Sequence, residues 1–429
     1  MPVGRVVTGR GGGPCRWADV AGRGGGACDP CGARPPEPPY DRAMAETTDV
    51  VVAGGGVIGL AAAWETAGRG LSVRVVDPAP GHGAAWVAAG MLAPVTESTF
   101  GEEALAGLFV AAADRWPGFA SRLQDATGSD TGFRTCGSVA VALDASDRAA
   151  IDQLLDHQLR LGLEASRLSA SECRALVPAL SPAVRGGALM PGDHQVDNRA
   201  LVLALIEGCA GAGVKLTSDR VVSVSLDRDG VAAGVVTESG ELFQAGTVVL
   251  AAGVGTPQIG GLPEGVVPPV RPVKGHTLRL RAEAGREAFP HTVRGLVHGR
   301  HCYLVPRADG TVVIGATSEE RGYDTRVQAG AVHSLLDDAR LLLPAVDEWE
   351  LLECIAGLRP GSPDNAPFVG PTSVARLVVA TGHYRNGFLL APITAEAIAE
   401  HLTGGEIPAP LAAFRADRHV EAARSERPS

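Results

Sequence analysis

The sequence of 429 residues lacks any hydrophobic run of the ~18 residues that a membrane-spanning helix needs. It also lacks a stripe of Lys and Arg, and its net charge is −10. An acidic chain without such a stripe is a poor partner for nucleic acid. We therefore expect a cytoplasmic protein that engages neither a membrane nor nucleic acid.

Cysteines in metal-binding or paired clusters are also missing from most of the chain. One C-x-x-C pair, Cys28 and Cys31, has no second pair nearby and is a weak signal for zinc or redox chemistry. Scattered cysteines fit a reducing compartment, and we predict no metal site. The scattered positions are Cys136, Cys173, Cys209, Cys302 and Cys354.

The first 43 residues differ in composition from the rest, since 17 of them are Gly or Pro. They show neither helical nor strand periodicity, and such a composition cannot bury enough apolar surface to become ordered. We expect residues 1–43 to form a disordered leader. We also expect Met44, just before the first predicted strand, to be the natural start of translation.

A strand, a glycine-rich turn, a helix and a second strand are predicted in succession from Asp49 to Asp77. The turn, Gly54-Gly55-Gly56-Val57-Ile58-Gly59, has the pattern G-x-G-x-x-G. Its first glycine makes the tight turn, its second lets the backbone approach a pyrophosphate, and its third lets helix pack on strand. Asp77 follows Gly59 by 18 residues, close to the ~20 expected for a carboxylate that binds a ribose hydroxyl. The pattern predicts a dinucleotide site without separating NAD from FAD.

The predicted fold is α/β and two-lobed. Segments 247–253 and 376–382 are expected to return to the first sheet as buried strands, so the Rossmann-like domain is discontinuous. Strands at 301–306 and 311–317, joined by a turn at 307–310, and a strand at 133–143 predict an inserted antiparallel sheet that roofs the cofactor. Helices are predicted over 148–161, 198–212 and 330–343.

Six further motifs carry a resemblance to a known family. They are Gly90–Pro94 (GMLAP), Gly192–Asp197 (GDHQVD), Arg271–Gly275 (RPVKG), His301–Arg307 (HCYLVPR), Gly357–Gly361 (GLRPG) and Gly382–Pro392 (GHYRNGFLLAP). In this order, over residues 46–420, the chain resembles the glycine oxidases of thiamine biosynthesis, FAD-dependent members of the D-amino-acid oxidase family. Residues 1–43 lie outside the resemblance.

The resemblance implies an FAD-binding domain of residues 44–130, 195–265 and 355–429, with a substrate domain of residues 131–194 and 266–354. It implies that FAD oxidises glycine through an imine to glyoxylate and ammonia, while oxygen is reduced to hydrogen peroxide. The imine could also be passed on for thiazole assembly. Sarcosine and small D-amino acids are alternative substrates, and relatives suggest a homotetramer.

Three residues are expected at the substrate. Arg359, in a Gly/Pro-rich stretch that predicts a rigid turn, would bind the carboxylate through two parallel N–H···O bonds. The resemblance places Tyr303 at the same carboxylate and Arg385 at another substrate-side position. Arg359 and Tyr303 are the predicted catalytic residues.

The resemblance assigns a larger set of residues to FAD. A helix predicted to open at Asn386-Gly387 would stabilise the reduced flavin with its N-terminal N–H groups by roughly 0.3–2 kcal/mol. The full set is Gly54, Gly56, Val57, Ile58, Gly59, Asp77, Pro78, Ala84, Ala85, Ala89, Gly90, Met91, Val221, His383, Tyr384, Arg385, Asn386, Gly387, Phe388 and Leu389.

Two positions depart from related sequences. Relatives carry Ser or Thr near Ala85, and losing that hydroxyl would cost about 0.5–1.5 kcal/mol if it made a net hydrogen bond. Gly357 stands where the sarcosine oxidases of this group attach their flavin to a cysteine, so we predict non-covalent FAD.

Two alternative functions remain open. One is a related amine or D-amino-acid oxidase or dehydrogenase with a different side-chain pocket. The other is a flavin-holding subunit with a role in assembly, which Arg359 and Tyr303 argue against because such a subunit needs no carboxylate clamp.

Overall fold

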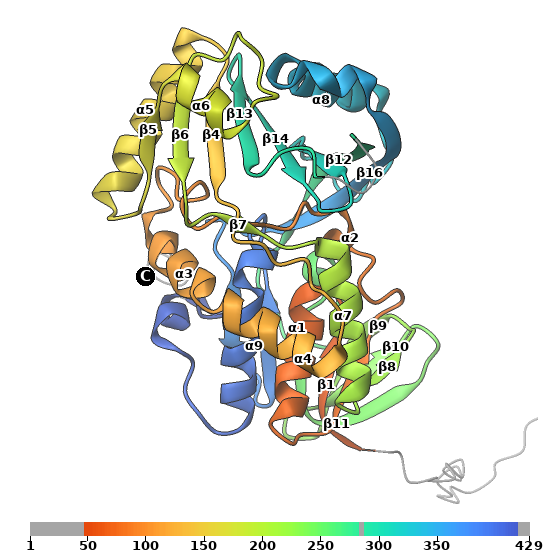
Figure 1. Ribbon diagram of the computed structural model, residues 1–429. Coiled ribbons are helices and arrows are strands. Elements are labelled where there is room, and N and C mark those ends of the chain that lie inside the picture. Colours follow the sequence, from red (N-terminus) through yellow and green to blue (C-terminus); the bar gives the residue numbers. More distant parts are fainter. Residues whose placement is uncertain (1–46, 283–286, 419–429) are drawn as a thin grey trace, which may run out of the picture. The chain divides into compact units, whose positions relative to one another are not determined.

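The computed structural model describes residues 47–282 and 287–418 (Figure 1). Our expectations for residues 1–43, including the Cys28–Cys31 pair and the start at Met44, lie outside the described residues. The helices are α1 Val57–Gly68, α2 Ala84–Val87, α3 Glu103–Ala113, α4 Trp116–Thr127, α5 Ala145–Arg160, α6 Ala170–Leu176, α7 Asn198–Gly211, α8 Ala329–Leu342 and α9 Gly387–Leu402, with 3-10 helices at Gly253–Gln258, Pro344–Glu348 and Ala409–Phe414.

The first of two eight-stranded sheets follows the predicted dinucleotide-binding pattern. Its strand order is β17-β18-β11-β1-β2-β8, and β9 and β10 extend it from β11. β1 pairs in parallel with β2 and β11, and β11 pairs in parallel with β18, so both later segments return to this sheet as predicted. The strands are β1 Thr48–Ala53, β2 Val73–Val76, β8 Lys215–Thr217, β9 Val221–Leu226, β10 Ala232–Thr237, β11 Leu242–Leu250, β17 Phe368–Pro371 and β18 Leu377–Thr381.

Both faces of β1 are covered, which explains its unbroken run of valines. Val50 and Val52 belong to the core that contains α1, α7 and α9, whereas Val51 packs with β10 and β11 residues on the opposite face. A strand buried on both faces reads as a continuous apolar run rather than an alternating one. In Figure 1, α1, α4, α7 and α9 gather on one side of this sheet.

The second sheet has the order β16-β12-β15-β14-β13-β4-β6-β5. The hairpin of β14 and β15 forms as predicted, with the Arg307 N–H donating to the Thr311 carbonyl across the turn at 2.7 Å. α8 packs on one face through Leu335, Ala339 and Leu342. The strands are β4 Ser138–Ala142, β5 Ser166–Leu168, β6 Gly187–Met190, β12 Arg271–Arg281, β13 Thr292–Val297, β14 Arg300–Pro306, β15 Thr311–Gly315 and β16 Glu350–Gly361, and a separate pair joins β3 Met91–Leu92 to β7 His194–Gln195.

Two sequence predictions about this sheet are wrong in part. The strand predicted at 133–143 begins only at Ser138, because Gly137 has a φ of +68° that interrupts extended structure. The sheet is mixed rather than antiparallel, since β13 pairs in parallel with β4.

The turn predicted around Arg359 is a strand. Arg359 lies in β16 opposite Val273 of β12. Pro360 is tolerated because β16 is an edge strand, where a missing N–H need not leave a neighbouring carbonyl unpaired. β16 also runs across position 354/355, where we placed a boundary between the two domains.

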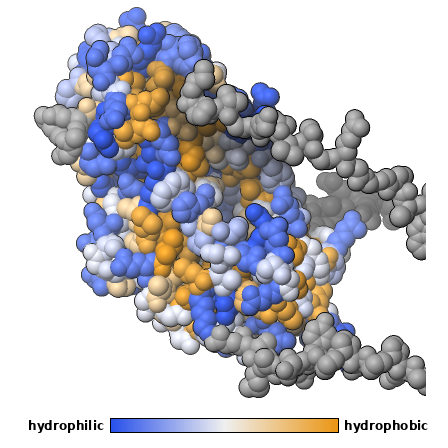
Figure 2. Space-filling view, turned by 90° about the vertical axis from the view of Figure 1, so that its right-hand side faces the viewer, coloured by the Kyte–Doolittle hydropathy of each residue, from blue (hydrophilic) through white to orange (hydrophobic). Residues whose placement is uncertain are grey.

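None of the helices in the described ranges is both long and apolar enough to span a bilayer. The face in Figure 2 carries both hydrophilic and hydrophobic residues, and the hydrophobic ones gather in several patches.

Candidate active site

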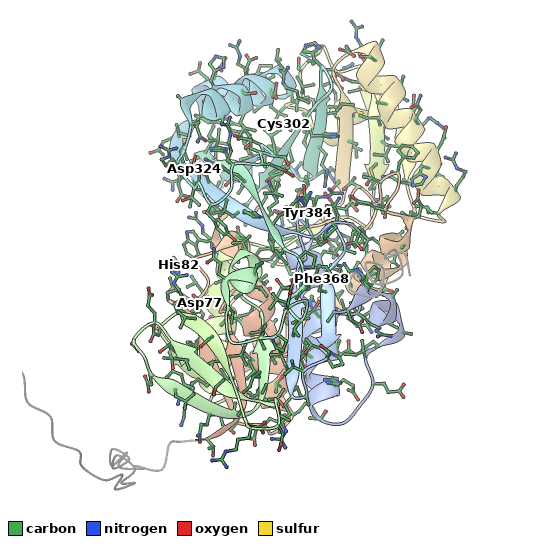
Figure 3. All side chains as sticks on the ribbon, turned by 180° about the vertical axis from the view of Figure 1, so that it is seen from behind. Asp77, His82, Cys302, Asp324, Phe368 and Tyr384 are labelled. Carbon is green, nitrogen blue, oxygen red and sulfur yellow. The ribbon has the colours of Figure 1, made fainter. Side chains whose placement is uncertain are left out.

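A cavity of about 1260 Å³ runs from the glycine turn after β1 to the inner face of the second sheet. Asp77 and His82 lie beside the first sheet, Cys302 lies in the second, and Tyr384 lies at the junction of the two (Figure 3). All four residues line the cavity. The site is therefore assembled from both sheets.

The glycine turn has the geometry that a dinucleotide needs. Gly54 has a φ of +110°, and a Cβ there would come within 2.5 Å of the Ala251 carbonyl oxygen. A Cβ on Gly59 would clash with the Gly54 carbonyl, so this glycine lets α1 pack closely on the turn. A Cβ on Gly56 would meet no atom within 4 Å, and Gly56 lines the cavity. The turn thus leaves room for a phosphate at the start of α1.

Asp77 lies just beyond the end of β2, next to the turn. Its Oδ2 accepts from the Gly55 N–H at 2.7 Å and its Oδ1 accepts from the Ala79 N–H at 2.8 Å. These bonds fix the carboxylate at the cavity wall, where its other lone pairs can accept from a ribose hydroxyl. Pro78 and Val221 line the same end of the cavity.

Hydrogen bonds from outside hold residues 84–91, which we call the 84–91 segment. Most of their carbonyl groups accept a hydrogen bond from α7, from Val196 just before it, or from the second sheet and its β14–β15 turn. The donors are Asn198 Nδ2 to Ala85 (2.8 Å) and Trp86 (3.0 Å), Thr277 Oγ1 to Val87 (3.0 Å), Arg307 to Ala89 (2.6 Å) and Val196 N to Gly90 (2.8 Å). Because the carbonyls point away, the segment is fixed against the cavity that Ala84, Ala85, Ala89, Gly90 and Met91 line.

The start of α9 reaches the same cavity through Asn386, Gly387 and Phe388. Its free N–H groups and dipole favour negative charge at that point. His383 is buried beside it, 3.1 Å from Thr394 Oγ1, and burial lowers the pKa of His383 to about 3. Leu389 lies in the core instead, where its carbonyl accepts from Trp116 Nε1.

The second sheet turns one face toward the cavity. Residues that pair directly across strands share a face, as do alternate residues along each strand. The pairs Thr277–Gly315, Gly315–Tyr303 and Tyr303–Arg294 therefore form a row across four strands, from β12 to β13. Gly275 and Gly357 form a neighbouring pair on β12 and β16, with Arg359 two residues further along β16.

Arg359 and Tyr303 lie over glycines of neighbouring strands. A Cβ on Gly275 would collide with the Arg359 guanidinium, and one on Gly315 would collide with the Tyr303 ring and hydroxyl. The guanidinium of Arg359 donates to the Thr317 carbonyl at 3.1 Å and lies 3.5 Å from the Lys274 carbonyl oxygen. No carboxylate pairs with Arg359 among the residues that the structure describes, and so its charge is available to a ligand.

Arg385, which we expected at a substrate-side position, is paired with two acids of the protein. It lines the cavity, but its guanidinium pairs with Glu97 and, at 2.8 Å, with Glu102. Glu97 also accepts from Arg294 at 2.8 Å. Burial alone would raise the pKa of Glu97, but the charges of Arg294 and Arg385 outweigh burial and lower the pKa to about 2.

The cavity brings together nearly every residue that the sequence singled out, with Gly59 and Leu389 as the two that do not line it. Sequence reasoning missed Glu97 and Arg294, which line the cavity, and gave no role to Arg307 of the His301–Arg307 motif, which donates to the Ala89 carbonyl. Arg294 could have been found from its place in Thr292–Val297, where a charged residue interrupts an apolar strand. Glu97 has no such signal.

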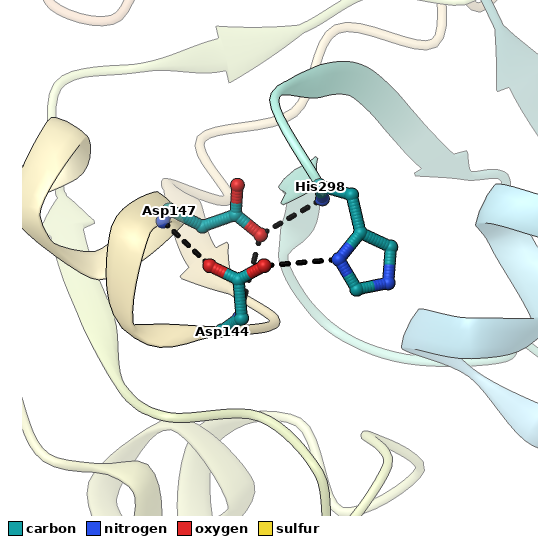
Figure 4. A group of neighbouring side chains, drawn as sticks. All are labelled: Asp144, Asp147 and His298. Carbon is teal, nitrogen blue, oxygen red and sulfur yellow. Dashed lines mark hydrogen bonds and ion pairs between the residues drawn. The ribbon is translucent and has the colours of Figure 1, made fainter.

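One cluster outside the cavity has the composition of a metal site, namely Asp144, Asp147 and His298 (Figure 4). Its four carboxylate oxygens already accept hydrogen bonds. Asp144 caps α5 through the Asp147 N–H at 2.9 Å and meets His298 Nδ1 at 2.9 Å. Asp147 accepts from the N–H groups of His298 and Gly299. The cluster fastens α5 to the turn after β13.

Comparisons with known proteins agree with this arrangement. The family described as FAD dependent oxidoreductase (DAO) matches residues 49–401. The glycine oxidase of Geobacillus kaustophilus is 32% identical over 88% of this chain and 98% of its own, and its crystal structure superposes with a TM-score of 0.79 over 87% and 99%. The iminodiacetate oxidase of Chelativorans sp. BNC1 is 26% identical with a TM-score of 0.76, over 85% of this chain and 98% of its own.

A longer relative matches over part of its length. The bifunctional protein ThiO/ThiG of Synechocystis is 34% identical over 88% of this chain, which spans 55% of that protein. The chain thus covers about half the length of this bifunctional relative. The glycine turn, the room at Gly56 and the α9 N-terminus suit FAD. On the family match, this chain belongs to the FAD-dependent oxidoreductases of the D-amino-acid oxidase family.

Proposed function

We propose that this protein oxidises glycine to glyoxylate and ammonia through an imine, with oxygen reduced to hydrogen peroxide. The observation that carries the proposal is the Arg359 guanidinium, which faces the cavity beside Tyr303 without a carboxylate partner in the described part of the chain. An unpaired guanidinium in a cleft matches the carboxylate of an amino acid in charge and in geometry. The similarity to glycine oxidases supports glycine as that amino acid.

Tyr303 suits the role of a neutral donor to the same carboxylate. Burial raises the pKa of its hydroxyl, although the charges of Arg359 and Arg294 oppose this effect. The phenol therefore keeps its proton at physiological pH and can donate it in a hydrogen bond. Two donors from different strands would fix the orientation of the carboxylate as well as its position.

The remaining chemistry needs little from the protein beyond placement. Bound FAD would accept the hydride from the substrate Cα and pass the electrons to oxygen. His301, at the same wall, has its pKa lowered by burial and by the charge of Arg294, so it adds no positive charge at neutral pH. The N–H groups at the start of α9 would stabilise negative charge on the reduced cofactor by roughly 0.3–2 kcal/mol.

A second candidate substrate class is sarcosine or a small D-amino acid, which a related oxidase or dehydrogenase would use. Beyond Tyr303 the cavity continues between apolar side chains of β13 and α5, including Leu296, Ile151 and Leu154. Such an extension could hold a methyl group or a short side chain.

The wider setting rests on the resemblance. We propose that the product imine or glyoxylate supplies thiazole synthesis for thiamine, and that the protein is a cytoplasmic homotetramer. We further propose non-covalent FAD, because Gly357 packs against Val87 where related flavoenzymes carry the attaching cysteine. Flavin that remains on the protein after acid precipitation would contradict this attachment mode.

The decisive experiment is a visible spectrum of the purified protein. A flavin spectrum that bleaches when glycine is added without oxygen, and returns with peroxide when oxygen is admitted, supports the proposal. Peroxide yields from glycine, sarcosine and D-proline then rank the two candidates. Negligible turnover of glycine beside rapid turnover of another amine would replace glycine with that amine.

A further inference from the structure

Two arginines flank Tyr303 in the cavity, and only one of them pairs with a carboxylate in the described part of the chain. Arg294 is the cross-strand neighbour of Tyr303 and pairs with Glu97 at 2.8 Å. Arg359, on the other side, donates to backbone carbonyls. Both positive charges oppose the rise in the pKa of the Tyr303 hydroxyl that burial causes. Of the two cations beside Tyr303, Arg359 is therefore available to a ligand and Arg294 is already neutralised.

Glu97 neutralises more than one arginine. Its carboxylate lies between Arg294 and Arg385, with a side chain that is 10% exposed, and it lines the cavity. Arg385 has a second acid in Glu102, at 2.8 Å. Arg294 has no other carboxylate among the ion pairs of the described residues, and its remaining contact is to the Met91 sulfur at 3.9 Å. Removal of the Glu97 charge would therefore leave Arg294 unpaired while Arg385 stayed paired.

Hydrogen bonds to the Asp193 carboxylate fix the backbone just before Glu97. Asp193, which is fully buried, accepts from the Val95 N–H at 2.9 Å and from the Thr96 hydroxyl at 2.7 Å. The Glu97 N–H donates to the Ala93 carbonyl at 3.2 Å. Glu97 cannot easily withdraw from the cavity to make room for another anion, because the turn that carries it is anchored at three points.

We propose that Glu97 is a specificity-determining residue that restricts the site to amino acids with a single carboxylate. This rests on the proposed function, in which Arg359 binds that carboxylate. A second carboxylate on the substrate would meet the negative charge of Glu97 instead of a free guanidinium. Discrimination of this kind works by penalising the wrong ligand, because like charges brought together in a buried site repel each other.

The test compares the binding of two ligands, methoxyacetate and diglycolate, to two proteins, wild type and Glu97→Gln. Methoxyacetate and diglycolate are ether analogues of sarcosine and iminodiacetate. They differ in one carboxylate and have no amine to oxidise, so their binding to the FAD-loaded enzyme is measured by calorimetry without turnover. Wild type should bind methoxyacetate at least about tenfold more tightly than diglycolate. Glu97→Gln should shift this ratio toward diglycolate by about tenfold or more, because Arg294 becomes available.

Two variants control the interpretation. Glu102→Gln removes the same formal charge but leaves the Glu97–Arg294 pair in place, so the ratio should stay at its wild-type value. The double variant Glu97→Gln/Arg294→Gln should lose the gain in diglycolate binding, because the receiving cation is gone. A ratio in Glu97→Gln within twofold of wild type, or an equal gain in Glu102→Gln, overturns the proposal.

Failure of a variant to fold does not leave the question open. Should Glu97→Gln yield no flavin-loaded protein, wild type alone decides, since equal affinity for the two ethers overturns the proposal. A protein that prefers methoxyacetate but produces no peroxide from glycine would refute the proposed function and leave the role of Glu97 standing. A protein that oxidises glycine but binds diglycolate equally well would refute the role of Glu97 alone.

Discussion

The guanidinium of Arg359 lies directly over the Cα of Gly275. Gly275 is two residues along β12 from Val273, the cross-strand partner of Arg359. Tyr303 of β14 lies over Gly315 of β15, its direct cross-strand partner, so that the two side chains lean toward each other across β12 and β15. In both cases the absence of a Cβ lets a long side chain lie along the sheet and reach the cavity. The two donors of the proposed carboxylate clamp are therefore positioned by glycines on the strands between them.

Gly275→Ala should displace the clamp without unfolding the protein. The added Cβ would collide with the end of a flexible side chain, which can move aside, so the strand survives and the guanidinium shifts. Misplacement of an orienting group by about 1 Å can cost about 100-fold in rate. Because the guanidinium would shift by up to that amount, we expect kcat/KM for glycine to fall by about 10- to 100-fold. The flavin spectrum should be retained.

The matched control for this change is Gly107→Ala in α3, where a Cβ would meet no atom within 4 Å. It should leave kcat/KM unchanged. Full activity in Gly275→Ala would mean that the position of Arg359 over Gly275 has no part in substrate binding.

Arg359 itself should be irreplaceable by lysine. A lysine keeps the charge but donates as a point rather than as a planar fork, and a hydrogen bond to a charged group is worth about 1.5–3 kcal/mol. We expect Arg359→Lys to raise KM and lower kcat/KM for glycine by about 10- to 150-fold, with FAD still bound. Stopped-flow bleaching of the flavin measures this. Arg321→Lys, on an exposed side chain of the neighbouring loop, is the control, and equal losses in both variants would contradict the clamp.

Much of this architecture was readable from the sequence, and the exceptions share one cause. The glycine turn, the β14–β15 hairpin and the start of α9 were predicted because each is set by residues close together in the chain. Arg359 was predicted in a turn because Gly and Pro flank it. Whether such a stretch is a turn or an edge strand depends on a partner strand that lies almost ninety residues earlier in the chain.

The same limitation hid the charge pattern of the site. Arg385 lines the cavity, but its pairing with Glu97 and Glu102 joins segments almost three hundred residues apart. Local propensity carries no information on such a pair. The sequence thus indicated which residues reach the cavity and left undetermined which of the arginines is free.

Arg307 should control how well FAD binds. It is buried and donates to the Ala89 carbonyl at 2.6 Å, within the 84–91 segment that lines the cavity. Arg307→Met would leave that carbonyl without its partner, and a buried unsatisfied group costs about 1–3 kcal/mol. We expect the dissociation constant of FAD to rise about 5- to 150-fold, measured by flavin fluorescence on the apoprotein.

The control for Arg307 is Arg340→Met, on the outer face of α8, where half of the side chain is exposed. It should leave FAD affinity unchanged. If Arg307→Met binds FAD as tightly as wild type does, then the hydrogen bonds from Asn198, Thr277 and Val196 hold the 84–91 segment well enough.

Asp193 should make stability depend on pH. Burial raises the pKa of this carboxyl to about 6, from an ordinary value of 3.8, despite hydrogen bonds from Thr96 and Val95 that lower it. An acid that binds its proton more tightly in the folded state stabilises the fold at low pH, and this contribution is lost as pH rises through the range between the two values. Between pH 5 and pH 8 the loss amounts to about 1.4 kcal/mol, since one pKa unit corresponds to 1.36 kcal/mol.

Asp193→Asn removes this titration while it keeps an acceptor for the Val95 N–H. The free energy of unfolding of wild type, relative to that of Asp193→Asn, should therefore fall by about 1.4 kcal/mol from pH 5 to pH 8, as measured by urea denaturation of the holoenzyme. Asp125→Asn, on the exposed face of α4, removes a carboxylate from an exposed position and serves as the control. A wild-type stability that rises relative to Asp193→Asn over this range would show that Asp193 is ionised and favourably paired in the fold.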